Sequence, residues 1–284
     1  MPEYPEVTVV TNSLKAQILN KKITDFKTLN PKFLKNISPE EFKANILNKT
    51  ITKVINIGKF IEITLSDQSR IISHLRMSGK YYIYPIKMLD FAYSQMHNYV
   101  FFILDEQFII CYNDARMFGG FDFIPSDDQR DLSQIKKLAN LPIDVDVEQL
   151  FNKLKRKNIS IKSVLLDQSL VLGIGNIYAD ESLWASQIHP MQKCNTLTKQ
   201  QLELLLSNAQ RIMDQSILQG GSSVHTYQSV NDTKGTYQNE LKVYGRANNL
   251  CFRCKIANLV KVRLDYKPNG RGTTFCPICQ EIKN

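Results

Sequence analysis

The sequence predicts a multidomain α+β protein with a β-rich N-terminal half, a helical second half and a small module at the C-terminal end. Three observations lead to this prediction. Short β-like runs recur from Lys22 to Ile124, apolar residues repeat at helical spacing within 198–218, and two CxxC pairs follow residue 250. With 284 residues and 43% hydrophobic content, the chain can bury more than one core.

The charge balance indicates the class of partner. The chain has 36 Lys and Arg residues against 27 Asp and Glu residues, a formal net charge of +9. Such a surface attracts polyanions in a salt-dependent way, although an ordinary solvated basic surface would look the same. No apolar run approaches the roughly 18 residues that cross a bilayer, and no signal peptide precedes the first strand. We therefore expect a soluble, intracellular protein without a membrane partner.

The first domain is expected to span residues 1–135. Pro5 is placed to begin a helix, and the apolar spacing that follows it predicts an amphipathic helix through Val7, Val10, Leu14 and Ile18. The β-like runs after it include ITKVINI, KFIEITL, RIISHL, KYYIYPI, YVFFIL and QFIICY. A helix packed on a β-sandwich fits this order.

The second domain is expected to span residues 145–235. One helix face is predicted from Leu202, Leu205, Leu206, Ala209, Ile212 and Met213. The segment LLDQSLVLGIGNIYADESLW predicts a helix, a double turn through Gly173 and Gly175, and a second helix from Asn176, whose first amides are suited to phosphate. A dinucleotide fold is excluded because no strand precedes these glycines and the third glycine is missing. The Gly- and Ser-rich residues 219–238 predict a loop.

The C-terminal module is expected to span residues 239–284 and to bind one structural Zn²⁺. Two CxxC pairs supply the four thiolates of a tetrahedral site, whereas a redox-active pair would need no second copy. Residues 260–267 alternate and then turn at 268–270, which predicts a two-stranded hairpin with Arg271 just past the turn. So small a hairpin needs the metal to fold. The predicted ligands are Cys251, Cys254, Cys276 and Cys279, while Cys111 and Cys194 are expected to be buried free thiols.

Eight motifs resemble those of the formamidopyrimidine-DNA glycosylases, the bacterial 8-oxoguanine DNA glycosylase/AP lyase family. They run in the family's order as MPEYPEV, GKF, HLRMSGK, YNDARMFGG, IKSVLLDQ, GIGNIYADESLW, NELKVYGR and GRGTTFCPICQ. The resemblance implies an N-terminal β-sandwich with flanking helices, a helix-two-turn-helix domain and a zinc-finger β-hairpin. It also implies a monomeric base-excision-repair enzyme of the bacterial cytoplasm and nucleoid. Its implied partner is double-stranded damaged DNA.

The first motif carries the implied chemistry. An N-terminal amine has a pKa of about 8 against about 10.4 for lysine, so Pro2 offers free base at neutral pH once Met1 is removed. The resemblance implies that Pro2 forms a Schiff base with the sugar, that Glu3 is the general acid, and that Lys59 and Arg271 act on the flanking phosphates during β,δ-elimination. Glu6 either supports this site or is an exposed first-turn charge.

The remaining motifs are implied to hold DNA. Met77 and Arg116 would fill the space left by an extruded nucleotide and Phe118 would wedge the adjacent step, with Arg116 favouring an opposite cytosine. Taken alone, Met77 and Phe118 also fit an ordinary core. Further DNA contacts are implied for His74, His97, Lys157, Lys162, Asn176 and Tyr244. The loop residues implied to face an oxidised purine are Val224, His225, Thr226 and Tyr227.

Three functions remain open at this point. The implied one is removal of 8-oxoguanine and formamidopyrimidines by a bifunctional glycosylase and lyase. A second is a glycosylase of the same fold for oxidised pyrimidines, against which residues 219–238 argue because those enzymes lack this loop. The third is a catalytically inactive zinc-finger DNA-binding protein, which would have no use for Pro2 and Glu3.

Overall fold

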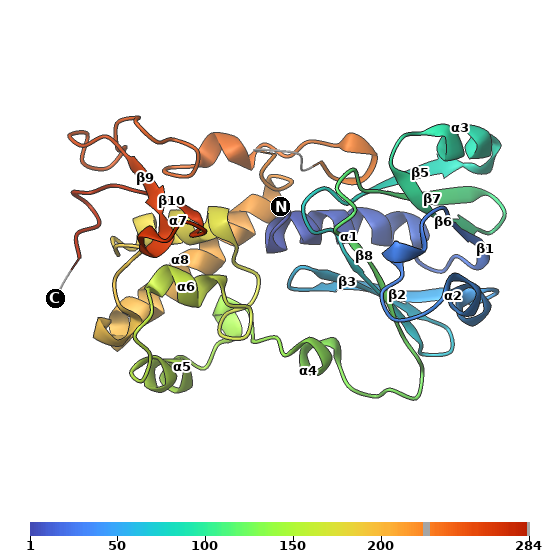
Figure 1. The fold of residues 1–284 in the computed structure, drawn as a ribbon, viewed down its shortest axis with the longest axis horizontal. Coiled ribbons are helices and arrows are strands. Elements are labelled where there is room, and N and C mark those ends of the chain that lie inside the picture. Colours follow the sequence, from blue (N-terminus) through green and yellow to red (C-terminus); the bar gives the residue numbers. More distant parts are fainter. Residues whose placement is uncertain (224–227, 283–284) are drawn as a thin grey trace. The chain divides into compact units, whose positions relative to one another are not determined.

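The computed structural model describes residues 1–223 and 228–282, and its contacts divide the chain into two units (Figure 1). The first unit contains Met1–Asp131 and Ile217–Gln238, and the second contains Leu132–Ser216 and Asn239–Asn284. This division differs from the expected one, because the loop segment 219–238 belongs to the first unit and the cysteine module shares a unit with the helices. Within the described ranges, no helix is both long and apolar enough to cross a membrane.

Two four-stranded antiparallel sheets form the frame of the first unit. One sheet has the order β1-β6-β7-β5 and the other has the order β2-β3-β4-β8. The strands are β1 (Ile23–Thr28), β2 (Ile51–Ile57), β3 (Phe60–Leu65), β4 (Arg70–His74), β5 (Lys80–Pro85), β6 (Asn98–Leu104), β7 (Phe108–Asn113) and β8 (Gly120–Ile124).

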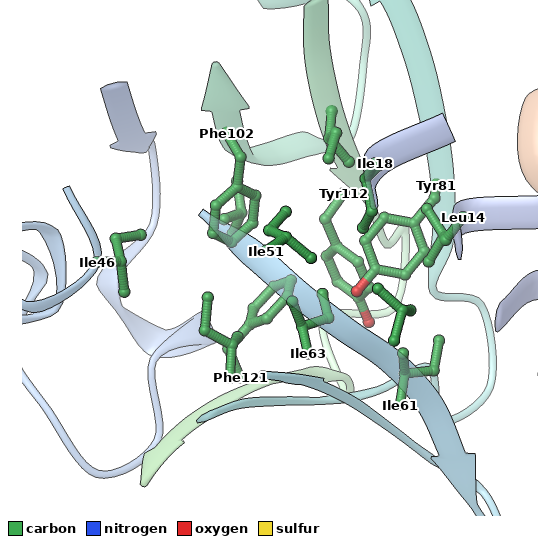
Figure 2. Packing of buried hydrophobic residues seen from close by; sticks show 14 of the residues in the cluster. Leu14, Ile18, Ile46, Ile51, Ile61, Ile63, Tyr81, Phe102, Tyr112 and Phe121 are labelled. Carbon is green, nitrogen blue, oxygen red and sulfur yellow. The ribbon is translucent and has the colours of Figure 1, made fainter. Parts of the chain in front are cut away.

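The core of the first unit lies between these sheets, which confirms the predicted β-sandwich. Phe102 and Tyr112 from one sheet meet Ile63 and Phe121 from the other in one buried cluster (Figure 2). Helix α1 (Tyr4–Ile18) buries its predicted apolar face in the same cluster, so its N-terminal end is held by the core. The other helices are α2 (Pro39–Ile46) and α3 (Leu89–Ser94).

Helices dominate the second unit. They are α4 (Leu132–Lys136), α5 (Val147–Leu154), α6 (Ile161–Leu166), α7 (Asn176–Ala185) and α8 (Lys199–Leu218). The predicted double turn joins α6 to α7, where Gly173 has a positive φ of 92° and donates its N–H to Gln168 Oε1 at 3.0 Å. The Gln168 amide also donates to the Ile174 carbonyl at 2.9 Å, so one side chain holds the turn.

A two-stranded antiparallel ribbon completes the second unit. Strand β9 (Val260–Arg263) pairs with β10 (Gly272–Phe275), which confirms the predicted hairpin. The expected alternation through Tyr266 is wrong: β9 ends at Arg263, and Tyr266 is 72% exposed. Asp265 and Tyr266 have φ values of 53° and 54°, and this left-handed backbone cannot continue a strand.

Candidate active site

The start of α1 is buried and held by a carboxylate. Glu6 Oε2 accepts the Glu3 N–H at 2.9 Å, and Glu6 Oε1 accepts the Ser222 N–H at 2.8 Å. Glu6 is only 1% exposed, so its interpretation as an exposed helix charge is wrong. It instead joins the N-terminal segment to the beginning of the 219–238 loop. Glu3 is also buried.

Lys59 lies in the tight turn between β2 and β3. Ile57 pairs with Phe60 across this turn, and Gly58 has a positive φ of 57°. Asn56 donates its amide both to the Gly58 carbonyl at 3.2 Å and to Thr8 Oγ1 of α1 at 2.9 Å. Asn56 therefore fixes the turn beside the start of α1. Sequence reasoning missed it, although a polar side chain two residues before Gly58, between Ile55 and Ile57, was a usable signal.

Four charged residues of the first unit act on the pKa of the chain's N-terminal amine. Burial lowers the pKa of the Met1 amino group, the Glu3 and Glu6 carboxylates oppose this shift, and the positive charges of Lys59 and Arg116 add to it. The amine belongs to the residue before the buried Pro2, so four of the sequence-predicted side chains, all in the first unit, act electrostatically on the N-terminal end of the chain.

In the segment 114–119, exposed side chains lie on a backbone that is held by the buried carboxylate of Asp114. Asp114 accepts the N–H groups of Arg116 at 3.1 Å and Gly119 at 2.8 Å, together with the Ser78 hydroxyl. The Arg116 guanidinium lies 4.9 Å from the Phe118 ring, which is 54% exposed. The interpretation of Phe118 as ordinary core is therefore wrong. Met77 is partly buried.

The two predicted histidines flank this segment. His74, at the end of β4, accepts the Arg76 N–H on Nδ1 at 2.9 Å and packs edge-on against Phe60. His97 precedes β6 with a positive φ of 69°, and its carbonyl accepts the Asp114 N–H at 3.0 Å. Both rings are partly buried, so each is held in place next to the exposed Arg116 segment.

Replacing Asp114 by alanine is expected to lower the free energy of unfolding by about 2–4 kcal/mol, because it leaves backbone donors without their buried acceptor. Urea denaturation measures this change. Asp127→Ala, at an exposed position, is the control and should leave the midpoint unchanged. Equal midpoints for the two variants would show that Asp114 does not hold the segment.

In the second unit, the structure contradicts one predicted DNA contact. Lys162 is completely buried, and its ammonium donates to Asp180 Oδ1 at 2.6 Å, to the Gly272 carbonyl at 3.1 Å and to Thr273 Oγ1 at 3.0 Å. All three of its N–H bonds are used inside the protein, so Lys162 cannot reach a phosphate. Asn176, another predicted contact, also donates to the Gly272 carbonyl at 2.9 Å.

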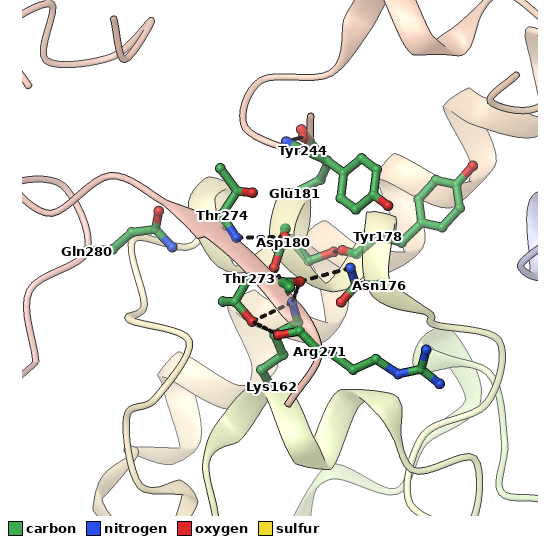
Figure 3. Close-up of polar contacts among 12 residues, drawn as sticks. Lys162, Asn176, Tyr178, Asp180, Glu181, Tyr244, Arg271, Thr273, Thr274 and Gln280 are labelled. Carbon is green, nitrogen blue, oxygen red and sulfur yellow. Dashed lines mark hydrogen bonds and ion pairs between the residues drawn. The ribbon is translucent and has the colours of Figure 1, made fainter. Parts of the chain in front are cut away.

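The other predicted contacts of this unit differ in their exposure. Arg271 is exposed, and its backbone carbonyl accepts the Leu264 N–H at 2.9 Å. Figure 3 shows its side chain extending away from the buried network. Tyr244 is partly buried and donates its backbone N–H to Glu181 at 2.8 Å. Lys157 is partly exposed between α5 and α6.

The four predicted cysteine ligands come together. Their sulfur atoms all lie within 4.8 Å of one another, which is a spacing that a metal ion can bridge. The Trp184 indole donates to Cys251 Sγ at 3.4 Å, so α7 contacts the cluster directly. Cys111 and Cys194 are buried free thiols, as expected.

The predicted base-facing residues Val224, His225, Thr226 and Tyr227 lie outside the described residues. The residues next to them are held by the first unit. Besides the Ser222 bond to Glu6, the Ser223 N–H donates to Gln238 Oε1 at 2.9 Å, and the Asn231 side chain accepts the Ile83 N–H of β5 at 2.9 Å.

Comparison with known proteins identifies the family. Residues 1–121 match the formamidopyrimidine-DNA glycosylase N-terminal domain, and residues 139–228 match the formamidopyrimidine-DNA glycosylase H2TH domain. The chain belongs to the formamidopyrimidine-DNA glycosylase family. A member from Mycoplasma mobile is 41% identical over 99% of this chain and 100% of its own length, and one from Lactobacillus johnsonii is 36% identical over 99% of each chain.

Solved structures of the family have the same fold. A Lactococcus lactis formamidopyrimidine-DNA glycosylase bound to DNA that contains an abasic site is 35% identical, covers 99% of this chain and 100% of its own, and superposes with a TM-score of 0.89. A MutM in complex with DNA containing carbocyclic 8-oxoguanine is 34% identical, with the same coverage and a TM-score of 0.88. The family motifs of this chain thus lie on the family's fold.

Proposed function

We propose that this member of the formamidopyrimidine-DNA glycosylase family removes oxidised purines, 8-oxoguanine and formamidopyrimidines, from duplex DNA and then cleaves the strand at the abasic sugar. The observation that carries the proposal is the set of buried charges at the N-terminus: Glu3, Glu6 and Lys59 are all buried, and the charge of each acts on the terminal amine. A protein that only binds DNA needs no such arrangement. The relatives of known structure, which were solved with damaged DNA, support the same substrate class.

In the proposed mechanism, Pro2 becomes the N-terminal residue when Met1 is removed. Its nitrogen forms a bond to C1′ as the base departs with the electron pair of the glycosidic bond, and the proton of the proline nitrogen passes to the departing base. Glu3 then protonates O4′ as the C1′–O4′ bond breaks, which leaves a cationic iminium on Pro2. The iminium accepts electrons from C2′, so loss of a C2′ proton expels the 3′ phosphate, and a second proton loss expels the 5′ phosphate.

Two cations, Lys59 and Arg271, are proposed to act on the DNA phosphates in this mechanism. Lys59, fixed by the β2–β3 turn, neutralises the phosphate that leaves in β-elimination. Arg271, exposed on the ribbon of the second unit, binds the phosphates that flank the lesion and assists δ-elimination. Tyr244, Asn176, Lys157, His74 and His97 are proposed as further DNA contacts.

The four-cysteine cluster is proposed to hold one structural zinc ion. Thiolates are the ligands that zinc prefers in closed structural sites, and the four sulfur atoms lie close enough to share one ion. Zinc would stabilise the ribbon and would leave no open position for substrate. The proposed reaction is therefore carried out by the Pro2 nitrogen and the side chains, and not by the metal.

The exposed 114–119 segment is proposed to enter the duplex, with Met77 at its side. Extruding a nucleotide costs a few kcal/mol, which is offset when side chains fill the gap. The Arg116 guanidinium lies over the Phe118 ring, and both side chains are exposed on a backbone that Asp114 holds. They are therefore already positioned on the surface to enter the duplex. The Arg116 guanidinium can donate two hydrogen bonds to an orphaned cytosine.

Replacing Arg116 by alanine is expected to reduce the preference for cytosine over adenine opposite the lesion by about 10- to 100-fold, because one good side-chain contact to a base is worth about 1–3 kcal/mol. Single-turnover excision rates on the two duplexes measure this ratio. Arg130→Ala, at an exposed arginine outside the proposed contacts, should keep the wild-type ratio. An unchanged ratio in Arg116→Ala would refute the proposed contact.

Borohydride trapping tests the proposed function. The purified protein should form a covalent complex with a duplex that carries 8-oxoguanine opposite cytosine, because the reductant converts the iminium to a stable amine. If protein whose N-terminus begins at Pro2 forms no covalent complex, the result would favour a catalytically inactive DNA-binding protein. A stronger complex with 5-hydroxyuracil or thymine glycol would favour the oxidised-pyrimidine enzyme.

A further inference from the structure

Helix α7 carries two consecutive buried acids, Asp180 and Glu181, which are not part of the proposed chemistry. Asp180 is 1% exposed. Its Oδ1 accepts the Lys162 ammonium at 2.6 Å, and its Oδ2 accepts the Thr274 N–H of β10 at 3.0 Å. One carboxylate therefore binds both a buried lysine and the backbone of the ribbon, as Figure 3 shows.

Lys162 extends this contact to the beginning of β10. Its other two donors bind the Gly272 carbonyl and the Thr273 hydroxyl, and Thr273 Oγ1 in turn donates to the Arg271 carbonyl at 3.0 Å. Asn176, at the start of α7, donates to the same Gly272 carbonyl. Two successive peptide carbonyls, those of Arg271 and Gly272, are thus fixed by side chains that lead back to α6 and α7.

A buried ion pair is a costly way to stabilise a fold. Removing two charges from water costs more than burying an apolar pair of similar volume, so stability alone does not account for Lys162 and Asp180 at this place. The pair instead fixes the positions of its hydrogen-bond partners, because an ammonium with three donors and a carboxylate with two oxygen acceptors specify where each partner atom must lie. Their partners in the ribbon are the three residues of β10 that directly follow Arg271.

We propose that the Lys162–Asp180 pair is a positioning device for Arg271: it fixes the backbone of residues 271–274 on α6 and α7, and so sets where the Arg271 guanidinium meets DNA phosphate. The inference rests on the role proposed above for Arg271. Lys162 and Asp180 are positioning residues, since neither side chain is exposed to substrate.

Glu181 offers a matched control on the same helix. It is as buried as Asp180, but its carboxylate accepts the N–H groups of Lys242, Val243 and Tyr244 at 2.9, 2.9 and 2.8 Å. It therefore holds the backbone at Tyr244 rather than the backbone at Arg271. Changes at the two acids should have separable effects.

The test compares Asp180→Asn and the double variant Lys162→Met/Asp180→Leu with Glu181→Gln and Arg271→Ala, each as the full zinc-loaded protein. The double variant keeps the buried volume without an unpaired charge, so it addresses the case in which Asp180→Asn fails to fold. The readout is the ratio of δ- to β-elimination products on a preformed abasic site, together with the salt dependence of DNA binding.

We expect the δ-to-β product ratio to fall about 10- to 100-fold in the pair variants, because small displacements of a catalytic group have effects of this size. The slope of log Kd against log salt should become shallower by about 0.9, the contribution of one lost phosphate contact. Glu181→Gln should keep the wild-type product ratio. In the Arg271→Ala background, the pair variants should change the ratio no further.

Three outcomes would overturn the inference: a wild-type product ratio in a zinc-loaded pair variant, the same ratio change in Glu181→Gln, or a further change of equal size in the Arg271→Ala background. If the wild-type protein forms no borohydride complex, the proposed function fails instead. The two failures are therefore distinguishable.

Discussion

Replacing Pro2 by leucine is expected to abolish borohydride trapping and to lower strand cleavage at least about 1,000-fold, because loss of a covalent nucleophile removes most of an enzyme's rate advantage. The proline nitrogen is proposed to be both the nucleophile and the electron sink. Pro2 is buried at the start of the chain, and burial lowers the pKa of the neighbouring Met1 amine.

The measurement needs two controls. Mass spectrometry establishes whether Met1 is present in each protein, because a retained methionine would block the proline nitrogen in the wild type. Binding to a duplex with a tetrahydrofuran abasic analogue, which cannot form an iminium, should change by less than about threefold in Pro2→Leu if the fold is intact. Trapping that persists in Pro2→Leu at the wild-type rate would place the nucleophile elsewhere.

Replacing Cys276 by serine is expected to release the metal and to weaken DNA binding at least about 100-fold. A structural zinc contributes about 10–16 kcal/mol to the folding of a small module, so a ribbon of two four-residue strands should not persist without it. Arg271 would then lose its fixed place. Elemental analysis for zinc and the Kd for a tetrahydrofuran duplex at constant salt measure the two effects.

Cys194→Ser is the matched control for the zinc ligand. Cys194 is buried but outside the four-cysteine cluster, and its thiol donates to the Leu154 and Lys157 carbonyls, which a serine hydroxyl can also do. This variant should keep zinc and DNA affinity. Full affinity in metal-free Cys276→Ser would show that the ribbon does not depend on the metal.

The sequence indicated features that depend on near neighbours in the chain. The apolar spacing of α1 and α8 predicted the faces that are buried, and the two CxxC pairs predicted the sulfur cluster. Gly173 predicted the double turn before α7, since only a residue that tolerates positive φ fits there without strain. These predictions held because helix period, ligand spacing and glycine conformation act over a few residues.

Other assignments depended on partners that are distant in the sequence. Lys162 was predicted to contact phosphate, yet its ammonium is used by Thr273, which lies 111 residues away. Glu6 could not be distinguished from an exposed helix charge until the structure placed the Ser222 amide, 216 residues away, on its carboxylate. The roles of Pro2, Glu3, Lys59 and Arg271 stay predictions that the variants above test.

By itself, the sequence determined the family, the order of the structural elements and the set of candidate side chains, because motifs and periodicity are written along the chain. Only the tertiary structure decided which charged side chains are free to meet DNA and which hold the protein together. A lysine in a motif looks the same whether its ammonium faces water or a buried Asp180. Burial and hydrogen-bond partners, which exist only after the chain has folded, separate the two.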